Sequence, residues 1–178
     1  MLLKKILVGI AGEPIVSDNK KIGHFMFGAG AVIEHPTENK ILIAKRAHTD
    51  HANGSWELIY GRVDNHEELE AGLKREVFEE TGLTNIKIKK VLRLWHFYRG
   101  DKTADKEIYG VTFICQAKND QVILNKEHTE YQWVTPEEAV NIINVKGINT
   151  DVKLYLDYLK NQNLKINLSN TQEAITTY

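Results

Sequence analysis

Acidic side chains gather in the segment GRVDNHEELEAGLKREVFEETGL, which runs from residue 61 to residue 83. Glu76, Glu79 and Glu80 lie close together at the end of what its pattern predicts to be a helix. Carboxylates in the last turn oppose the helix dipole and repel one another at these spacings, which costs roughly 1–4 kcal/mol in total. A bound divalent cation would neutralise them, and oxygen-only ligands favour Mg²⁺ or Mn²⁺ over zinc. The segment therefore predicts a metal site.

The helix that carries these carboxylates is predicted to run from about Asn65 to about Thr81. Asp64, followed three residues later by Glu67, has the spacing of a capping box, a pattern that starts helices. Gly82 is a natural residue for the position just after the helix, where the backbone adopts a positive φ.

The predicted helix also gives the carboxylates a direction. At about 100° per residue, Glu76 and Glu80 fall within about 20° of Leu69 on the apolar stripe, and Glu79 lies on its flank. A solvated charged face, which is the plainer interpretation, would place the glutamates opposite the leucines. Neighbouring basic side chains could supply one or two counter-charges, but a cation would also explain why the carboxylates point inward.

The spacing of these residues resembles the Nudix box over its whole length. The matching positions are Gly61, Glu67, Arg75, Glu76, Val77, Glu79, Glu80, Gly82 and Leu83. The wider resemblance covers about residues 20 to 145, where WELIYG is similar to the usual Trp-x-x-Pro-Gly-Gly and YQWVTPEEA to the usual late strand and helix. It implies an α/β fold, a Nudix-type α/β/α sandwich with a mixed β-sheet. It also implies hydrolysis of the phosphoanhydride of a nucleoside diphosphate linked to another moiety.

The resemblance assigns a role to each acidic position of the box. Glu76, Glu79 and Glu80 would bind the metal, together with the carbonyl oxygen of Gly61. Glu67 would support the site and, in some members, contact the metal.

The resemblance also implies the catalytic groups. Arg75 would hold the carboxylates through charge-assisted hydrogen bonds. The bound metal would neutralise the phosphates and lower the pKa of the water that attacks phosphorus. Glu80 or a loop glutamate would accept the proton of that water. Glu127 and Glu130 both stand near the usual place of the loop acid, and the sequence does not choose between them.

Four residues are candidates for substrate binding: Arg46, Trp56, Tyr60 and Tyr98. Ile59 and Tyr60 replace the usual Pro-Gly before Gly61, so Tyr60 is expected to fill space near the substrate. A tyrosine about sixteen residues after the box is associated in the family with dinucleoside polyphosphates, and Tyr98 stands there. The absence of proline in that region weighs against an ADP-ribose hydrolase.

The strand that holds Tyr98 carries a run of aromatic side chains. Strand alternation sends Trp95 and Phe97 to one face and His96 and Tyr98 to the other. One pair is expected in the core, and the other could stack on a nucleobase.

Several alternatives have less support. GAGAVI at 28–33 lacks the third glycine and the following helix of a nucleotide-binding loop. His48 and His51 have no nearby cysteine to complete a zinc site. A nucleotide-binding or regulatory module of the Nudix fold usually loses carboxylates from the box, and this chain keeps them. An isomerase of that fold needs a cysteine before the helix, whereas Cys115 lies after it.

The elements that must position these residues are read from periodicity and turn signals. Strands are predicted at 22–34, 40–47, 56–60, 86–98, 108–117, 121–125 and 131–134, and helices at 135–144, begun by Thr135, and at 150–160. We expect residues 1–178 to form a single domain with its core at about 20–160 and a loosely held polar tail at 161–178.

Composition limits the partners and the compartment. A net charge of −1 offers no basic field for nucleic acid or membrane, so the expected partner is a small nucleoside diphosphate derivative; a homodimer is left open. A lone cysteine fits a reducing, cytoplasmic setting. MLLKKILVGIAGE is predicted as a first strand rather than a signal peptide, because its apolar run is only about seven residues long before Glu13. No run reaches the ~18 apolar residues of a membrane span.

Overall fold

The structure is a computed structural model that describes residues 25–47 and 54–175. The strand predicted before Glu13 lies outside the described residues, as do His48 and His51. Within the described ranges, no helix is long and apolar enough to cross a membrane.

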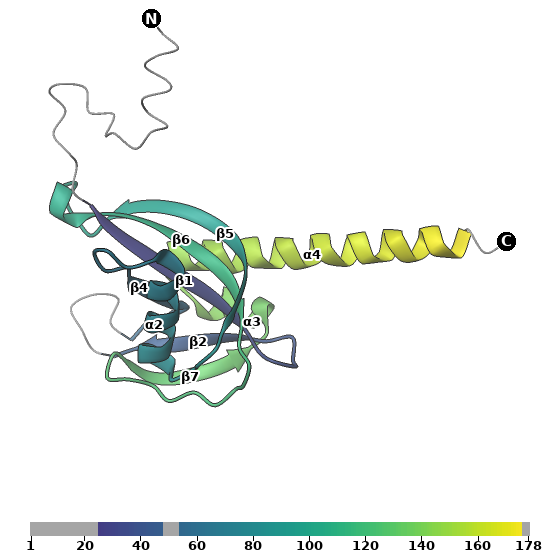
Figure 1. Cartoon of the computed structure of the whole chain (residues 1–178), viewed down its shortest axis with the longest axis horizontal. Coiled ribbons are helices and arrows are strands. Elements are labelled where there is room, and N and C mark those ends of the chain that lie inside the picture. Colours follow the sequence, from purple (N-terminus) through teal and green to yellow (C-terminus); the bar gives the residue numbers. More distant parts are fainter. Residues whose placement is uncertain (1–24, 48–53, 176–178) are drawn as a thin grey trace, which may run out of the picture.

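Seven strands form one mixed sheet (Figure 1). They are β1 (Met26–Glu34), β2 (Ile41–Arg46), β3 (Trp56–Glu57), β4 (Ile59–Arg62), β5 (Lys87–Tyr98), β6 (Glu107–Gln116) and β7 (His128–Val134). The order is β3-β2-β1-β6-β5, with β4 paired to β1 and β7 paired to β2. β1 and β6 run parallel, and the other pairs are antiparallel. A short 3-10 turn, η1 (Ala104–Lys106), lies between β5 and β6.

Helices cover both faces of this sheet (Figure 1). α2 (Leu69–Thr81) packs on one face, and α3 (Pro136–Ile142) and α4 (Lys146–Ile175) pack on the other. The alternation of β1 divides the core accordingly: Ala31 and Ile33 face α2, whereas Val32 faces α3 and α4. The predicted α/β/α sandwich with a mixed sheet is confirmed.

The strand predicted at 56–60 is in fact two short strands with different partners. β3 pairs with β2, and β4 pairs with β1. The residues on either side of this change of partner adjoin α2: the charge of Glu57 on β3 acts on Glu80, and a Cβ on Gly61 of β4 would overlap Glu76.

The start of α2 was predicted too early. The helix begins at Leu69 rather than Asn65, and its N-cap, Glu68, makes no side-chain capping bond. His66 has a positive φ of 65°, which a helix cannot contain. Glu67 Oε2 does accept the Asp64 amide at 3.0 Å, so half of the expected capping box forms, but it closes a turn before the helix.

The strand predicted at 121–125 is wrong. Val122 and Leu124 do face the core, which explains the alternating pattern. Their backbone, however, binds the end of a helix rather than another strand: the Ile123 amide donates to Thr81 O at 2.8 Å and the Asn125 amide to Glu80 O at 3.3 Å. The segment therefore satisfies free carbonyls at the end of α2.

The two C-terminal helices follow the predicted order. Thr135 caps α3 as expected, with a full capping box formed with Glu138. α4 is longer than the predicted 150–160, since it begins at Lys146 and continues to Ile175. Its distal part projects away from the sheet (Figure 1).

Candidate active site

The carboxylates of α2 point as their helical positions predict. The Glu80 side chain is buried at 4% exposure, and only 16% of the Glu76 side chain is exposed. Glu79, on the flank, keeps 51% of its side chain in solvent. A solvated charged face is therefore excluded for two of the three glutamates, and α2 buries two carboxyl groups at its end, where the helix dipole disfavours their ionised form.

Gly61 lets β4 approach α2 closely enough to form the site. A Cβ at this position would overlap the side chain of Glu76. A side chain at this position would therefore displace the Glu76 carboxylate from its present place.

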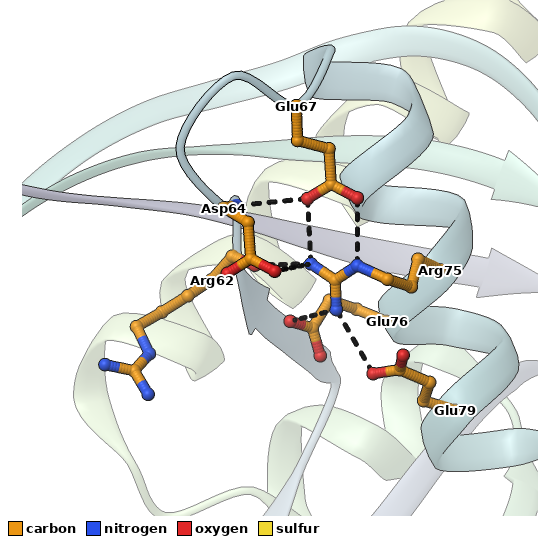
Figure 2. Close-up of polar contacts among 6 residues, drawn as sticks. All are labelled: Arg62, Asp64, Glu67, Arg75, Glu76 and Glu79. Atoms are coloured by element: carbon orange, nitrogen blue, oxygen red, sulfur yellow. Dashed lines mark hydrogen bonds and ion pairs between the residues drawn. The ribbon is translucent and has the colours of Figure 1, made fainter.

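Arg75 is the centre of a polar network that joins α2 to the preceding loop (Figure 2). Its guanidinium donates two bonds to Glu67, at 2.8 and 2.9 Å, one to Glu76 at 3.0 Å and one to Glu79 at 3.1 Å. It also donates to the carbonyl oxygen of Arg62 at 2.9 Å. Hydrogen bonds from Arg75 lower the pKa of Glu67 to about 2. The same bonds raise the pKa of Arg75 above its ordinary value, so the group stays charged.

Glu80 is the carboxylate that the network does not reach. Its Oε2 is buried and has no hydrogen-bond partner. Burial, followed by the negative charges of Glu57, Glu76 and Glu127, raises the pKa of Glu80 to about 9. Burial also raises the pKa of Glu76, against the influence of Arg75. Negative charge at this point is under-compensated by the protein.

The donor set suits a hard cation, although it is not arranged around one. Carboxylate and carbonyl oxygens are the ligands that Mg²⁺ and Mn²⁺ prefer, and the free Oε2 of Glu80 is an available donor. In the described part of the chain, no three acidic, histidine or cysteine groups stand close enough to hold a metal as they are placed. Arg75 occupies Glu76 and Glu79 instead, so a cation would have to draw these side chains away from it.

A second buried polar group adjoins Glu80, and its residues are not among the candidates predicted from the sequence. Glu57, on β3, accepts a hydrogen bond from Arg46 at 2.8 Å and lies 3.1 Å from Nε2 of His128. Glu57 and His128 are both buried, at 7% and 4% exposure. A glutamate between apolar neighbours in a short strand was the available signal, because such a side chain needs a buried partner.

The structure separates the two candidate loop acids. Glu127 lies in the turn before β7, and its charge contributes to the raised pKa of Glu80. Glu130 lies on β7 and pairs with Lys45 at 2.6 Å. Of the two, Glu127 is therefore the acid near the carboxylate helix.

The candidate substrate-binding residues fall into different places. Arg46 lies at the site, and its positive charge acts on Glu80. Trp56 packs against the core on the α3–α4 face, where Lys45 Nζ lies 6.0 Å from its ring.

The two candidate tyrosines are not at the carboxylates. The hydroxyl of Tyr60 donates to Asp151 of α4, and burial, followed by the charge of Asp151, raises the pKa of Tyr60 well above its ordinary value. The Tyr98 hydroxyl donates to Glu107 at 3.0 Å and its ring meets His96 edge-on, and within the described residues it makes no hydrogen bond to an α2 carboxylate. The interpretation of Tyr98 as a substrate contact gains no support from this geometry.

Solved structures share this fold. A MutT protein from Methanosarcina mazei Go1 superimposes with a TM-score of 0.63 at 24% identity, over 79% of this chain and 99% of that one. An Ap4A hydrolase from C. elegans gives a TM-score of 0.62 at 20% identity, over 76% and 98% of the two chains. At these identities the likeness concerns the fold alone.

Other proteins are similar to this chain in sequence. The nucleoside triphosphatase NudI of Escherichia coli is 36% identical over 95 residues, which are 49% of this chain and 67% of that protein. A MutT-like protein of Streptomyces ambofaciens is 29% identical over 116 residues, 65% of this chain and 67% of that protein. The family model of the NUDIX domain matches residues 24–155. The chain therefore belongs to the NUDIX family and is a Nudix hydrolase, an enzyme that acts on phosphoanhydride bonds of nucleotides.

Proposed function

We propose that this enzyme is a Mg²⁺- or Mn²⁺-dependent pyrophosphohydrolase for a nucleoside diphosphate linked to another moiety. One observation carries the proposal: Glu80 is a buried carboxylate without a hydrogen-bond partner, set among other carboxylates. A protein rarely keeps such a group unless a ligand satisfies it. A cation is the ligand whose charge and chemistry match it.

The ligands of this cation would be Glu76, Glu79, Glu80 and the carbonyl oxygen of Gly61. Glu67 would act through Arg75, to which it is bound by two hydrogen bonds. When bound, the metal neutralises the phosphate oxygens and makes the attacking water more acidic.

Arg75 would position the ligands rather than contact the substrate. Its planar fork fixes Glu67 with two parallel bonds while its remaining N–H groups hold Glu76 and Glu79. When a cation takes the two glutamates, the bonds to Glu67 and to the Arg62 carbonyl would keep the guanidinium in place as an ordered neighbour of the site.

We assign the proton acceptor to Glu127. Glu80 would be engaged as a ligand, and Glu130 is held by Lys45. Glu127 is exposed, and its turn lies close enough to Glu80 for the two charges to interact. A carboxylate in this position can take the proton of the attacking water without losing any partner seen in the structure.

The test is a phosphate-release screen of the purified enzyme with Mg²⁺. The panel contains nucleoside triphosphates, nucleotide sugars, ADP-ribose and dinucleoside polyphosphates, with phosphatase added to detect nucleotide products. Glu80→Gln should abolish turnover on every substrate that the parent cleaves. Glu70→Gln removes the same charge from the exposed side of the same helix and should leave turnover unchanged.

Failure of this screen has a defined meaning. If the folded parent cleaves nothing on the panel, catalysis is refuted for these substrate classes. The alternative, a nucleotide-binding or regulatory module of the same fold, would then be tested by nucleotide binding.

A further inference from the structure

Polar side chains gather on the α2 face of the sheet where β2, β3 and β7 meet. Glu57 of β3 pairs with Ala44 of β2, and Arg46 of β2 pairs with His128 of β7. Ala44 belongs to the core under α2. Cross-strand partners share a face, as do residues two apart on one strand, so all three polar side chains lie on the side of the helix that carries Glu80.

A β-bulge brings His128 to this face. Lys45 pairs with Glu130, but the next residue of β2, Arg46, pairs with His128, so β7 contains one extra residue, Thr129. In a regular ladder Thr129 would lie opposite Arg46. Bulges re-aim side chains and are frequent beside active sites. Here the bulge buries the imidazole of His128 and leaves Thr129 exposed.

Glu57 holds His128 in this buried position. The carboxylate accepts from Nε2 of His128 at 3.1 Å and from Arg46 at 2.8 Å, so it joins three strands. Nδ1 of His128 is buried and has no hydrogen-bond partner among the described residues. An apolar side chain would fill this position without leaving a polar atom unpaired. Packing alone therefore does not account for a histidine here.

The residue before His128 is Glu127, the proton acceptor of the proposed reaction. The backbone of its turn is tied to two elements of the site. The Glu127 carbonyl accepts the Ala47 amide at 2.7 Å, and the Glu127 amide donates to Oδ1 of Asn125 at 2.8 Å. The Asn125 amide in turn donates to the Glu80 carbonyl at 3.3 Å. Because the Glu127 side chain is exposed, its direction depends on this turn.

We propose that His128, held by Glu57, positions the turn of Glu127 so that this carboxylate meets the attacking water. The inference rests on the proposed function, in which Glu127 accepts the proton, and it adds a residue outside the Nudix box to the reaction. A general base must lie within hydrogen-bond reach of the water. A displacement of about 1 Å can lower the rate about a hundredfold, so a buried anchor next to the base matters. His128 is a positioning residue, because it acts on the reaction through its neighbour.

A second route from His128 to the reaction must be separated from this one. The negative charge of Glu57 also acts on Glu80, a proposed metal ligand. If His128 acted through Glu57 on the cation, its removal would change the affinity for metal. If it acts through Glu127, metal affinity stays the same and only the rate changes.

The kinetic test uses the best substrate found in the phosphate-release screen. His128→Leu removes the donor to Glu57 and should lower kcat about tenfold or more, with KM changed by less than about twofold. His128→Gln can still donate to Glu57 and should retain most of kcat. In a Glu127→Gln background, His128→Leu should cause no further loss, because the group that it positions is gone. If His128→Leu does not fold, His128→Asn, whose amide is too short to reach Glu57, takes its place.

His35 provides a matched control. It is buried like His128 and also organises a turn, since its Nδ1 accepts the amides of Thr37 and Glu38 at 3.3 and 3.1 Å. This turn lies at the other end of β2, before Ile41. His35→Leu should destabilise the fold in thermal melts and leave both kcat and KM unchanged, which shows that losing a buried imidazole is not by itself enough to slow the reaction.

Two further measurements need no turnover. Hydrogen exchange of the Ala47 amide, followed by NMR, reports its bond to the Glu127 carbonyl. It should become about tenfold faster in His128→Leu and stay unchanged in His128→Gln and His35→Leu. Calorimetry with Mn²⁺ alone should give the parent and His128→Leu the same affinity within about twofold.

The outcomes separate this inference from the proposed function. In an active enzyme, the inference is overturned by full kcat in His128→Leu, by an equal further loss in the Glu127→Gln background, or by a loss of Mn²⁺ affinity that accounts for the slower rate. Each of these results leaves the proposed hydrolysis standing. A parent that cleaves nothing refutes the proposed function instead, and exchange of the Ala47 amide then decides whether His128 orders the turn.

Discussion

Replacing Glu80 by glutamine should stabilise the metal-free enzyme. The substitution nearly preserves shape and removes a carboxyl group that the fold buries without a hydrogen-bond partner and resists ionising. The pKa of Glu80 is about 9 in the folded protein, compared with 4.5 for an ordinary glutamate. At 1.36 kcal/mol per pKa unit, this shift lowers the stability of the fold by about 3 kcal/mol at pH 7 and about 6 kcal/mol by pH 9, because the unfolded chain ionises Glu80 while the fold keeps it protonated. Since the amide has hydrogen-bonding needs of its own, we expect a net gain of about 1–3 kcal/mol at pH 7.

The sign of the pH dependence follows from the raised pKa. Below about pH 4.5, Glu80 is protonated in both the folded and the unfolded chain, so the parent and the variant should differ little. As pH rises toward 9, the unfolded chain ionises Glu80 freely while the fold resists, and the parent loses stability relative to the variant. The advantage of Glu80→Gln should therefore grow across this window.

Urea denaturation in EDTA at several values between pH 4.5 and pH 9 measures this difference. Glu70→Gln is the matched control: its side chain is 66% exposed, and its substitution should change the free energy of unfolding by less than about 0.5 kcal/mol at any pH. With saturating Mg²⁺ the order should reverse, because binding at a hundred times the Kd adds about 2.7 kcal/mol to the parent. If Glu80→Gln instead destabilises the chelated enzyme by more than about 1 kcal/mol at pH 8, the protein itself holds the charge and the argument for a cation fails.

Three further outcomes follow from the same site. Chelation by EDTA should abolish hydrolysis, and either Mg²⁺ or Mn²⁺ should restore it; full activity after chelation would contradict a metal-dependent reaction. Arg75→Lys, which cannot form the paired bonds to Glu67, should lower kcat by about tenfold or more with little change in KM, and a raised KM alone would place Arg75 on the substrate. Gly61→Ala should destabilise the fold by about 1–3 kcal/mol and remove most activity through its overlap with Glu76, whereas Gly147→Ala, which meets no atom within 4 Å, should be neutral or slightly stabilising in thermal melts.

The direction of the carboxylates could be predicted because its signal is local. Residues four apart on a helix share a face, so the position of Leu69 fixes those of Glu76 and Glu80 wherever the helix packs. The signal for the end of α2 is also local, since Gly82 adopts a φ of 68° that favours glycine. The beginning of α2 has no such local signal, because Glu67 binds Arg75, eight residues later, as well as the amide of Asp64 in the loop.

Contacts between distant segments explain what the sequence could not predict. Glu57 and His128 are separated by 71 residues, and neither has a motif that would connect it to the other. The segment 121–125 has the alternation of a strand, yet its backbone finds partners on α2. Alternation reports which side chains are buried but not which backbone groups pair.

Tyr60 shows how a departure from the family pattern depends on residues far along the chain. Its ring occupies the space above Gly30, its partner on β1, where any Cβ would overlap it. Its hydroxyl binds Asp151, a fully buried carboxylate that also accepts from Thr112 and pairs with Arg93. A tyrosine at this position therefore requires a glycine thirty residues earlier and a charge-compensated aspartate on α4. A glycine in its place would open a space between the sheet and α4, next to Gly61, which adjoins Glu76. The residues that fill this space therefore come from four strands and a helix, and none of them belongs to the box.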